Sequence, residues 1–208
     1  LIVMGDSGSI PTTPSSTVTV TVAGTASNGS TFTILPPPSI SSVAPAAGPP
    51  GTVVTVTGTN FGASQGASTV RFNGTTASVT SWSNTQVVAP VPATATSGNV
   101  VVTVNGVATN GVAFTVAAAP PVLTPAGGTY AAGQTVAISS ATPGATIYYT
   151  TNGADPTPAD SPLSNGGIVP VGNYTIKARA YANGLAASGV TQAAYQRDSA
   201  ACTYAIRP

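Results

Sequence analysis

Residues 17–34, TVTVTVAGTASNGSTFTI, align without a gap with residues 99–116, NVVVTVNGVATNGVAFTV. Ten of the 18 aligned positions are identical, and Phe32 falls on Phe114, 82 residues later. Recurrence at a fixed spacing indicates a repeated structural unit. The sequence therefore predicts an 82-residue unit, preceded by a copy of the same unit that holds only its second part.

Within the unit, apolar and polar residues alternate. Val100, Val102 and Val104 are predicted to share one face of a strand, as are Val54 and Val56. A period of two is typical of strands that are buried on one face only. No stretch of ten residues combines helical periodicity with a cap, so the sequence predicts an all-β fold.

Asn-Gly pairs separate the predicted strands. Both residues tolerate positive φ, which a two-residue type I′ hairpin requires at its two central positions. Short strands rich in Val and Thr, punctuated by such turns, predict antiparallel β-sandwiches. The seven pairs begin at residues 28, 73, 105, 110, 152, 165 and 183.

Two proline-rich joints divide the chain, LPPPS at 35–39 and AAAPPV at 117–122. Proline fixes φ and removes a hydrogen-bond donor, so both joints are predicted to be short, stiff linkers. The predicted domains are 1–35 (the second half of a unit), 36–117 (a complete unit), 118–196 (a further domain) and 197–208 (a tail or the start of another β-domain).

The composition excludes several classes of protein. Only 4% of the 208 residues are charged and the net charge is +1, so there is no electrostatic footprint for nucleic acid. No apolar run approaches the length of a membrane span. The charge-poor, thiol-poor, Thr-rich composition favours an extracellular or cell-surface protein. Because the chain begins at Leu1, we expect it to be a segment of a longer protein.

Residues 38–117 resemble an IPT/TIG domain. The resemblance rests on a proline before the first strand, on GTVVTVTGTNFG (51–62), on VRFNG (70–74) and on the closing FTV. It implies an immunoglobulin-like sandwich. Residues 1–35 match only the second half of the same family, so another polypeptide is expected to complete them: preceding sequence, or an adjacent subunit that donates a strand.

Residues 120–196 resemble the immunoglobulin-like repeat found at the C-terminus of chitobiase and β-hexosaminidase. The matching stretches are GGTY (127–130), IYYTTNGADPT (147–157), TIKARA (175–180) and AAY (193–195). Asn152 stands where that family usually has Asp. The short CTYAIRP (202–208) resembles the opening of a BACON-type β-repeat, which would place a disulfide partner of Cys202 outside this chain.

Asp155 and Asp160 are the candidates for a pair of functional carboxylates. Both lie close before a proline, a pattern typical of turn-forming acids, and we favour that role. A calcium site needs six to eight oxygen ligands, and general acid–base catalysis needs a carboxylate in a cleft. Neither requirement has support in the sequence.

The chain lacks the residues that other catalytic mechanisms require. The chain has no His and no Glu, a single Cys and a single Lys. A Ser-His-Asp triad and a Cys- or His-based metal site are therefore excluded. GASQGAS (62–68) has no Lys and opens no helix, so it is not a phosphate loop. A crosslink between Lys177 and an asparagine is disfavoured. The sequence predicts no enzyme activity, no metal and no cofactor.

The remaining candidate is a sugar-binding strip. Along residues 173–181, Thr175, Lys177, Arg179 and Tyr181 share one face and oppose a face of Tyr174, Ile176, Ala178 and Ala180. A solvated outer face is the favoured interpretation, since antiparallel sheets alternate in this way. The alternative is carbohydrate contact through Lys177, Arg179 and Tyr181, with Tyr148 as a neighbour, because one tyrosine of 148–149 should face outward.

Trp82, the only tryptophan, fits core packing and an exposed sugar platform equally well. The function that we expect is structural: a stalk, spacer or fibre segment of a large modular protein. The alternative is an accessory carbohydrate-binding region of a secreted polysaccharide-degrading enzyme. The expected partners are neighbouring immunoglobulin-like domains and, in the alternative, polysaccharide.

Overall fold

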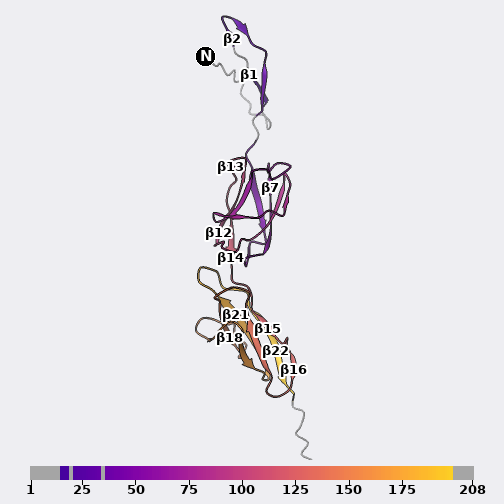
Figure 1. Ribbon diagram of the computed structural model, residues 1–208, viewed down its shortest axis with the longest axis vertical. Helices are drawn as coiled ribbons and strands as arrows, with labels where there is room; N and C mark the ends of the chain where they lie inside the picture. The colour runs from indigo at the N-terminus through magenta and orange to yellow at the C-terminus, as the bar shows by residue number, and fades with distance from the viewer. Residues whose placement is uncertain (1–14, 19–20, 34–35, 199–208) are drawn as a thin grey trace, which may run out of the picture.

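The computed structural model describes residues 15–18, 21–33 and 36–198. Strands and turns make up these residues, and among them no helix is present that could span a membrane. Two β-sandwiches follow one another along the described chain (Figure 1). The all-β prediction is confirmed.

The first sandwich packs two sheets face to face. One has the strand order β10-β11-β7-β5, and the other has β6-β14-β12-β8-β9 with β13 beside β12. The strands are β5 (Ser39–Ala44), β6 (Ala47–Gly48), β7 (Val53–Thr59), β8 (Thr69–Phe72), β9 (Thr75–Ala77), β10 (Ser81–Trp82), β11 (Gln86–Pro90), β12 (Gly98–Val104), β13 (Val107–Ala108) and β14 (Val112–Val116).

The core of this sandwich follows the predicted alternation. Val54 and Val56 on β7 and Val100 and Val102 on β12 are fully buried. The ring of Phe114 meets that of Phe72 edge-to-face, with centroids 5.3 Å apart. Burying a side chain of this size contributes about 1.5–3 kcal/mol, so these inward-facing residues hold the two sheets together.

The second sandwich has the sheet orders β15-β17-β20 and β16-β22-β21-β18-β19. Tyr195 is buried in its core, and burial raises the pKa of this phenol. The strands are β15 (Val122–Thr124), β16 (Gly128–Tyr130), β17 (Thr135–Ser139), β18 (Thr146–Thr150), β19 (Ser161–Leu163), β20 (Gly167–Pro170), β21 (Tyr174–Tyr181) and β22 (Thr191–Arg197).

Both sandwiches begin in the same way. The first strand is followed by a cis peptide bond, before Pro45 in one sandwich and before Pro125 in the other. The chain then passes to the opposite sheet as a short strand that pairs in parallel with the last strand, β6 with β14 and β16 with β22. Each sandwich thus closes its second sheet with one parallel pair.

The incomplete repeat near the N-terminus forms a hairpin with the same register as its full copy. β1 (Ser15–Val18) pairs with β4 (Ser30–Thr33), and β2 (Thr21–Val22) pairs with β3 (Thr25–Ala26). The pairs Ser16–Phe32 and Thr21–Ala26 become Gly98–Phe114 and Thr103–Ala108 when 82 is added to each number. The alignment of 17–34 with 99–116 therefore holds for these strand pairs.

The Asn-Gly prediction is correct at two positions and wrong at five. Asn73-Gly74 and Asn105-Gly106 have positive φ at both residues, as a type I′ turn requires. The pairs at 152, 165 and 183 have positive φ only at the glycine, and those at 28 and 110 at neither residue. The hairpin between β2 and β3 turns instead at Ala23-Gly24.

Candidate binding surface and the joint between the sandwiches

The outer strip comprises Tyr148 of β18 and Lys177, Arg179 and Tyr181 of β21. These side chains are partly exposed, whereas their alternating neighbours on β21 (Ile176, Ala178 and Ala180) are buried, as predicted. Tyr148 lies opposite Arg179 in the antiparallel pair of strands. The sheet therefore brings these four predicted residues onto one face.

The members of the outer strip are engaged with one another. The rings of Tyr148 and Tyr181 meet edge-to-face with centroids 5.4 Å apart. The guanidinium carbon of Arg179 lies 5.9 Å from the centroid of the Tyr181 ring, and its Nε donates a hydrogen bond to the carbonyl of Ser188 (2.8 Å). Stacking of a sugar on Tyr181 would have to compete with these contacts.

The outer strip also holds the 151–160 loop. Lys177 Nζ donates to Asp155 Oδ1 at 2.7 Å, and the hydroxyl of Tyr181 donates to the carbonyl of Pro156 at 3.1 Å. The hydrogen bond from Lys177, with the charge of Lys177 next, holds the pKa of Asp155 below its ordinary value of 3.8. The predicted turn role of Asp155 is corrected: its carboxylate pairs with a lysine on the neighbouring strand.

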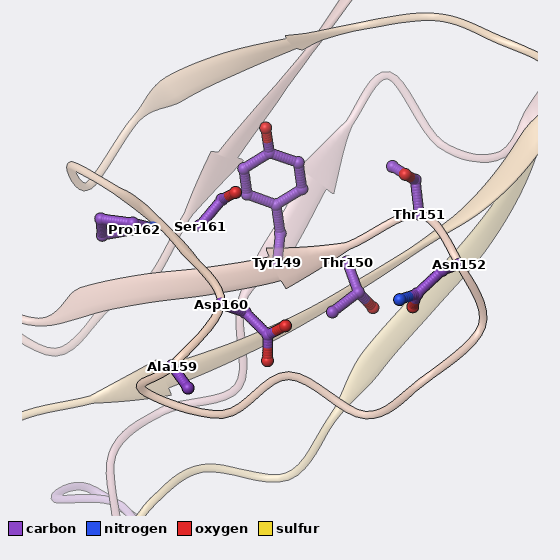
Figure 2. Close-up of a pocket in the computed structure, with 8 residues that line it drawn as sticks. All are labelled: Tyr149, Thr150, Thr151, Asn152, Ala159, Asp160, Ser161 and Pro162. Carbon is purple, nitrogen blue, oxygen red and sulfur yellow. The ribbon is translucent and has the colours of Figure 1, made fainter.

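Asp160 does have the predicted turn role. Its Oδ2 accepts hydrogen bonds from both the backbone N–H and the hydroxyl of Thr157, each 2.8 Å long. Asp160 lines a shallow pocket with Tyr149 and Asn152, and Figure 2 shows the tyrosine ring and the carboxylate pointing in different directions. Over the described ranges, no cluster of three potential metal-ligating side chains occurs.

The two adjacent tyrosines face opposite sides of the sheet, as predicted. Tyr148 lies on the outer face against Tyr181, and Tyr149 packs against the core of the second sandwich. The aromatic pair at 148–149 thus supplies one ring to the core and one to the outer strip.

Trp82 lies in the first sandwich, apart from the outer strip. Its ring packs near Phe61, with centroids 6.2 Å apart, and it is partly buried against the first core. The indole N–H donates to the carbonyls of Phe61 and Gly62, at 3.2 and 3.1 Å. These contacts favour the core-packing alternative. Cys202 lies outside the described residues.

Two asparagines that the sequence assigned to turns act as clamps on a neighbouring backbone. Asn110 Oδ1 accepts the N–H of Ile40 (2.9 Å), and its Nδ2 donates to the carbonyl of the same residue (3.0 Å). Asn165 binds Ser140 in the same way, with both bonds 2.8 Å long. A side-chain amide carries one acceptor and two donors, so it can satisfy a strand residue as another strand would.

The second proline-rich joint, 117–122, is held by contacts with both sandwiches. The N–H of Ala118 donates to the carbonyl of Ala186 (2.9 Å), and the N–H of Ala186 donates to the carbonyl of Val116 (3.0 Å). Ala118 is buried in the second core, while Leu185 of the second sandwich packs against the first core. Contacts other than the prolines therefore connect this joint to both sandwiches.

The order of strands, the two packed sheets and the paired cores define both sandwiches as immunoglobulin-like domains in tandem. Residues 38–116 match the IPT/TIG domain family, and residues 125–192 match the chitobiase/beta-hexosaminidase C-terminal domain family. Both predicted resemblances are confirmed. No curated protein matches the chain.

Several solved structures are similar to this chain. A putative phosphatase from Bacteroides thetaiotaomicron is 26% identical with a TM-score of 0.37, over 44% of this chain and 21% of that one. A gamma-CGTase from alkalophilic Bacillus clarkii is 19% identical (TM-score 0.38; 87% and 31%). A surface glycan-binding protein from Prevotella bryantii is 12% identical (TM-score 0.36; 75% and 41%). The chain spans less than half the length of each.

Proposed function

We propose that this chain is a non-catalytic, stiff spacer within a modular protein that is exported to the cell surface or beyond it. The observation that carries the proposal is the joint around Ala118 and Ala186. Domains within one chain generally move relative to one another unless their interface is large and apolar. Here two backbone hydrogen bonds run in opposite directions across a very short connection, and Leu185 packs across it.

The joint restrains both bending and twisting. The two hydrogen bonds place Ala186 beside the segment that leaves β14, as a short parallel bridge to Ala117. Opening the joint would break the hydrogen bond from Ala186 to Val116 of the first sandwich and expose Leu185, which packs against the first core. A chain of such domains would keep a fixed spacing between whatever it joins, which is the mechanical property that a stalk needs.

The second candidate function is carbohydrate binding. It is favoured by the match of residues 125–192 to a domain family of carbohydrate-processing enzymes, and its candidate site is the outer strip. Against it, the side chains of the outer strip hold one another and the 151–160 loop. A shallow surface with few free stacking faces is expected to bind no more tightly than about the millimolar level.

Domain orientation in the whole chain tests the spacer proposal. Residual dipolar couplings of both sandwiches should fit a single alignment tensor, whereas Leu185→Ser should require two. Leu163→Ser is the matched control, because Leu163 packs only against the second core. Independent alignment of the two sandwiches in the unaltered chain would refute the proposal.

Titration with soluble fragments of chitin, cellulose and pectin tests the second candidate. We expect no saturable change in backbone chemical shifts at Lys177, Arg179 or Tyr181. Saturable shifts centred on these residues, abolished by Tyr181→Ala, would replace the spacer by a carbohydrate-binding module.

The non-catalytic part of the proposal has its own assay. We expect the chain to release no product from chitin or glucan. Asp155 is bound to Lys177 and Asp160 to Thr157, and of these two carboxylates only that of Asp160 lines the pocket beside Tyr149. Turnover that survives Asp155→Ala and Asp160→Ala would show a catalytic site elsewhere.

A further inference from the structure

The Asn-Gly pairs of the two sandwiches share a chemistry that their structural roles do not use. The peptide nitrogen of the glycine can attack the side-chain Cγ of the asparagine, because glycine has no Cβ to obstruct the approach. A new C–N bond closes a succinimide ring, and the side-chain amide leaves as ammonia with the proton of the glycine N–H. Solvent water then opens the ring to aspartate, or to isoaspartate, whose main chain is one carbon longer.

Hydrogen bonds hold both clamp asparagines against this reaction. Asn110 and Asn165 each use the amide oxygen and the amide nitrogen to bind a distant backbone. The N–H of Gly166, which would have to attack Asn165, also donates to the carbonyl of Ile138 (2.9 Å). Ring closure at either asparagine therefore requires two or more hydrogen bonds to open first.

Weaker restraints act at three further pairs. Asn73 Nδ2 donates to Thr96 Oγ1 (2.8 Å), and Asn152 Oδ1 accepts the N–H of Ala154 (3.0 Å). Asn105 has no side-chain hydrogen bond within 36–198, but it occupies a type I′ turn between the paired strands β12 and β13. Strand pairing fixes both ends of that turn, so it opposes the backbone rotation that closes the ring.

Asn183-Gly184 has none of these restraints. Both residues are exposed, and over 36–198 neither the amide of Asn183 nor the N–H of Gly184 has a hydrogen-bond partner. The pair lies between β21 and β22 in a turn closed by one hydrogen bond, from the N–H of Leu185 to the carbonyl of Ala182 (3.2 Å). Of the six pairs in the two sandwiches, this is the one at which the structure leaves the attack unhindered.

The same turn leads directly into the joint between the sandwiches. Leu185 packs against the first core, and Ala186 donates to Val116 and forms a bridge with Ala117. Asn183 and Leu185 both line a groove of about 790 Å³ that residues of the two sandwiches form, and none of its lining residues is charged. Isoaspartate at this position would lengthen the main chain just before Leu185 and place a carboxylate in this uncharged groove.

We propose that Asn183-Gly184 is a site of spontaneous deamidation, and that isoaspartate formed there loosens the joint between the sandwiches. The reaction needs only solvent water and releases ammonia, so modified chains accumulate as the protein ages. The loosening rests on the proposed spacer function. The deamidation rests only on the chemistry and the contacts of the Asn-Gly pairs.

Peptide mapping by mass spectrometry tests the deamidation. The folded whole chain is incubated at mildly alkaline pH in isotopically labelled water, which marks each carboxylate that forms. We expect Asn183 to react at least about threefold faster than Asn73 or Asn152, and at least about tenfold faster than the two clamp asparagines, because one or more hydrogen bonds must open at those sites.

The same incubation in denaturant is the control for local sequence. All six pairs should then react at similar rates, because each asparagine precedes a glycine and the folded contacts are absent. A rate at Asn183 no higher than at Asn73 or Asn152 in the folded chain would overturn the assignment. So would an equally large advantage of Asn183 in denaturant, since the structure would then not be its cause.

Domain orientation tests the loosening. The isoaspartyl chain is purified by chromatography, and its residual dipolar couplings should require two alignment tensors. Asn183→Ala, incubated in parallel, cannot form the succinimide and should keep a single tensor. Freshly prepared Asn183→Asp carries the charge without the additional carbon and should also keep one.

A single tensor for the isoaspartyl chain would refute the loosening and leave the spacer proposal standing. Two tensors already in the fresh, unmodified chain would refute the spacer proposal and the loosening with it. The mass measurement would still decide the deamidation in either case.

Discussion

The asparagines show what a dipeptide can and cannot predict. Asn-Gly correctly predicts the turns at Asn73 and Asn105, because positive φ at both positions is a local requirement that these residues satisfy. Asn110 and Asn165 have the same neighbour but hold a distant backbone, 70 and 25 residues away in sequence. Those partners are set by the tertiary fold, so no local pattern could distinguish a clamp from a turn.

Replacing Asn110 should lower the unfolding free energy more than replacing an asparagine such as Asn183, which lies in an exposed turn. Asn110→Ala leaves the N–H and carbonyl of Ile40 without partners, and each lost hydrogen bond costs about 0.5–1.5 kcal/mol. We expect the first sandwich to lose about 1–3 kcal/mol of unfolding free energy in a denaturant titration. Asn183→Ala should change it by less than about 0.5 kcal/mol, as is usual for surface substitutions. Equal effects would contradict the clamp.

Ala23 is expected to be a weak point of the N-terminal hairpin. It has a φ of 48° at the position that asparagine occupies in the full copy, Asn105. Alanine rarely adopts this conformation, whereas asparagine tolerates it. Ala23→Asn should therefore slow amide exchange across β2 and β3, and Asn105→Ala should speed it across β12 and β13. A faster exchange in Ala23→Asn would contradict this assignment.

At the scale of the strand, the sequence predicts faces better than contacts. The alternation in β21 correctly separates buried Ile176 from partly exposed Lys177, because a strand has a strict period of two. The contacts that the outward-facing residues make could not be deduced from the alternation. The loop that contains Asp155 and Pro156 returns over the sheet, and its contacts with Lys177 and Tyr181 depend on a path that has no periodic signature.

The Lys177–Asp155 contact should make the 151–160 loop sensitive to acid. The pKa of Asp155 is lower in the folded chain than its ordinary value of 3.8, so the pair stabilises the folded loop fully above that value. The contribution is lost as the pH falls through the lower, folded-state pKa. Amide exchange of the loop should therefore be constant from neutral pH to about pH 5, after correction for intrinsic rates, and rise below the ordinary pKa.

Two variants separate the contribution of the Asp155 carboxylate from that of the Tyr181 hydroxyl. Asp155→Asn should speed amide exchange of the 151–160 loop at neutral pH. The exchange should not change further as the pH falls, because the carboxylate is absent. Tyr181→Phe should loosen the loop at every pH, because it removes the hydrogen bond to the carbonyl of Pro156 and leaves the Lys177–Asp155 pair in place. An unchanged acid response in Asp155→Asn would assign the effect to another group.

At the scale of the whole molecule, the two sandwiches meet at a contact that neither domain pattern contains. The two family matches end at residue 116 and begin again at residue 125, so the joint falls between them. Ala117 and Ala118 look like part of a linker, and Leu185 lies in a turn next to Asn183-Gly184. Packing of Leu185 against the first core arises only when both sandwiches are folded and adjacent.

A substitution in the second sandwich should therefore destabilise the first. Leu185→Ser removes a partly buried side chain that packs against the first core, and we expect a loss of about 1–2 kcal/mol there, less than for a fully buried leucine. Amide exchange at Val54, Val56 and Val100, measured under conditions where exchange requires global opening, reports this loss. Leu163→Ser should leave these amides unchanged and speed exchange only in the second sandwich, where Leu163 packs. If both variants affected the second sandwich alone, the joint would be a contact without energetic coupling, and the proposal of a stiff spacer would lose its support.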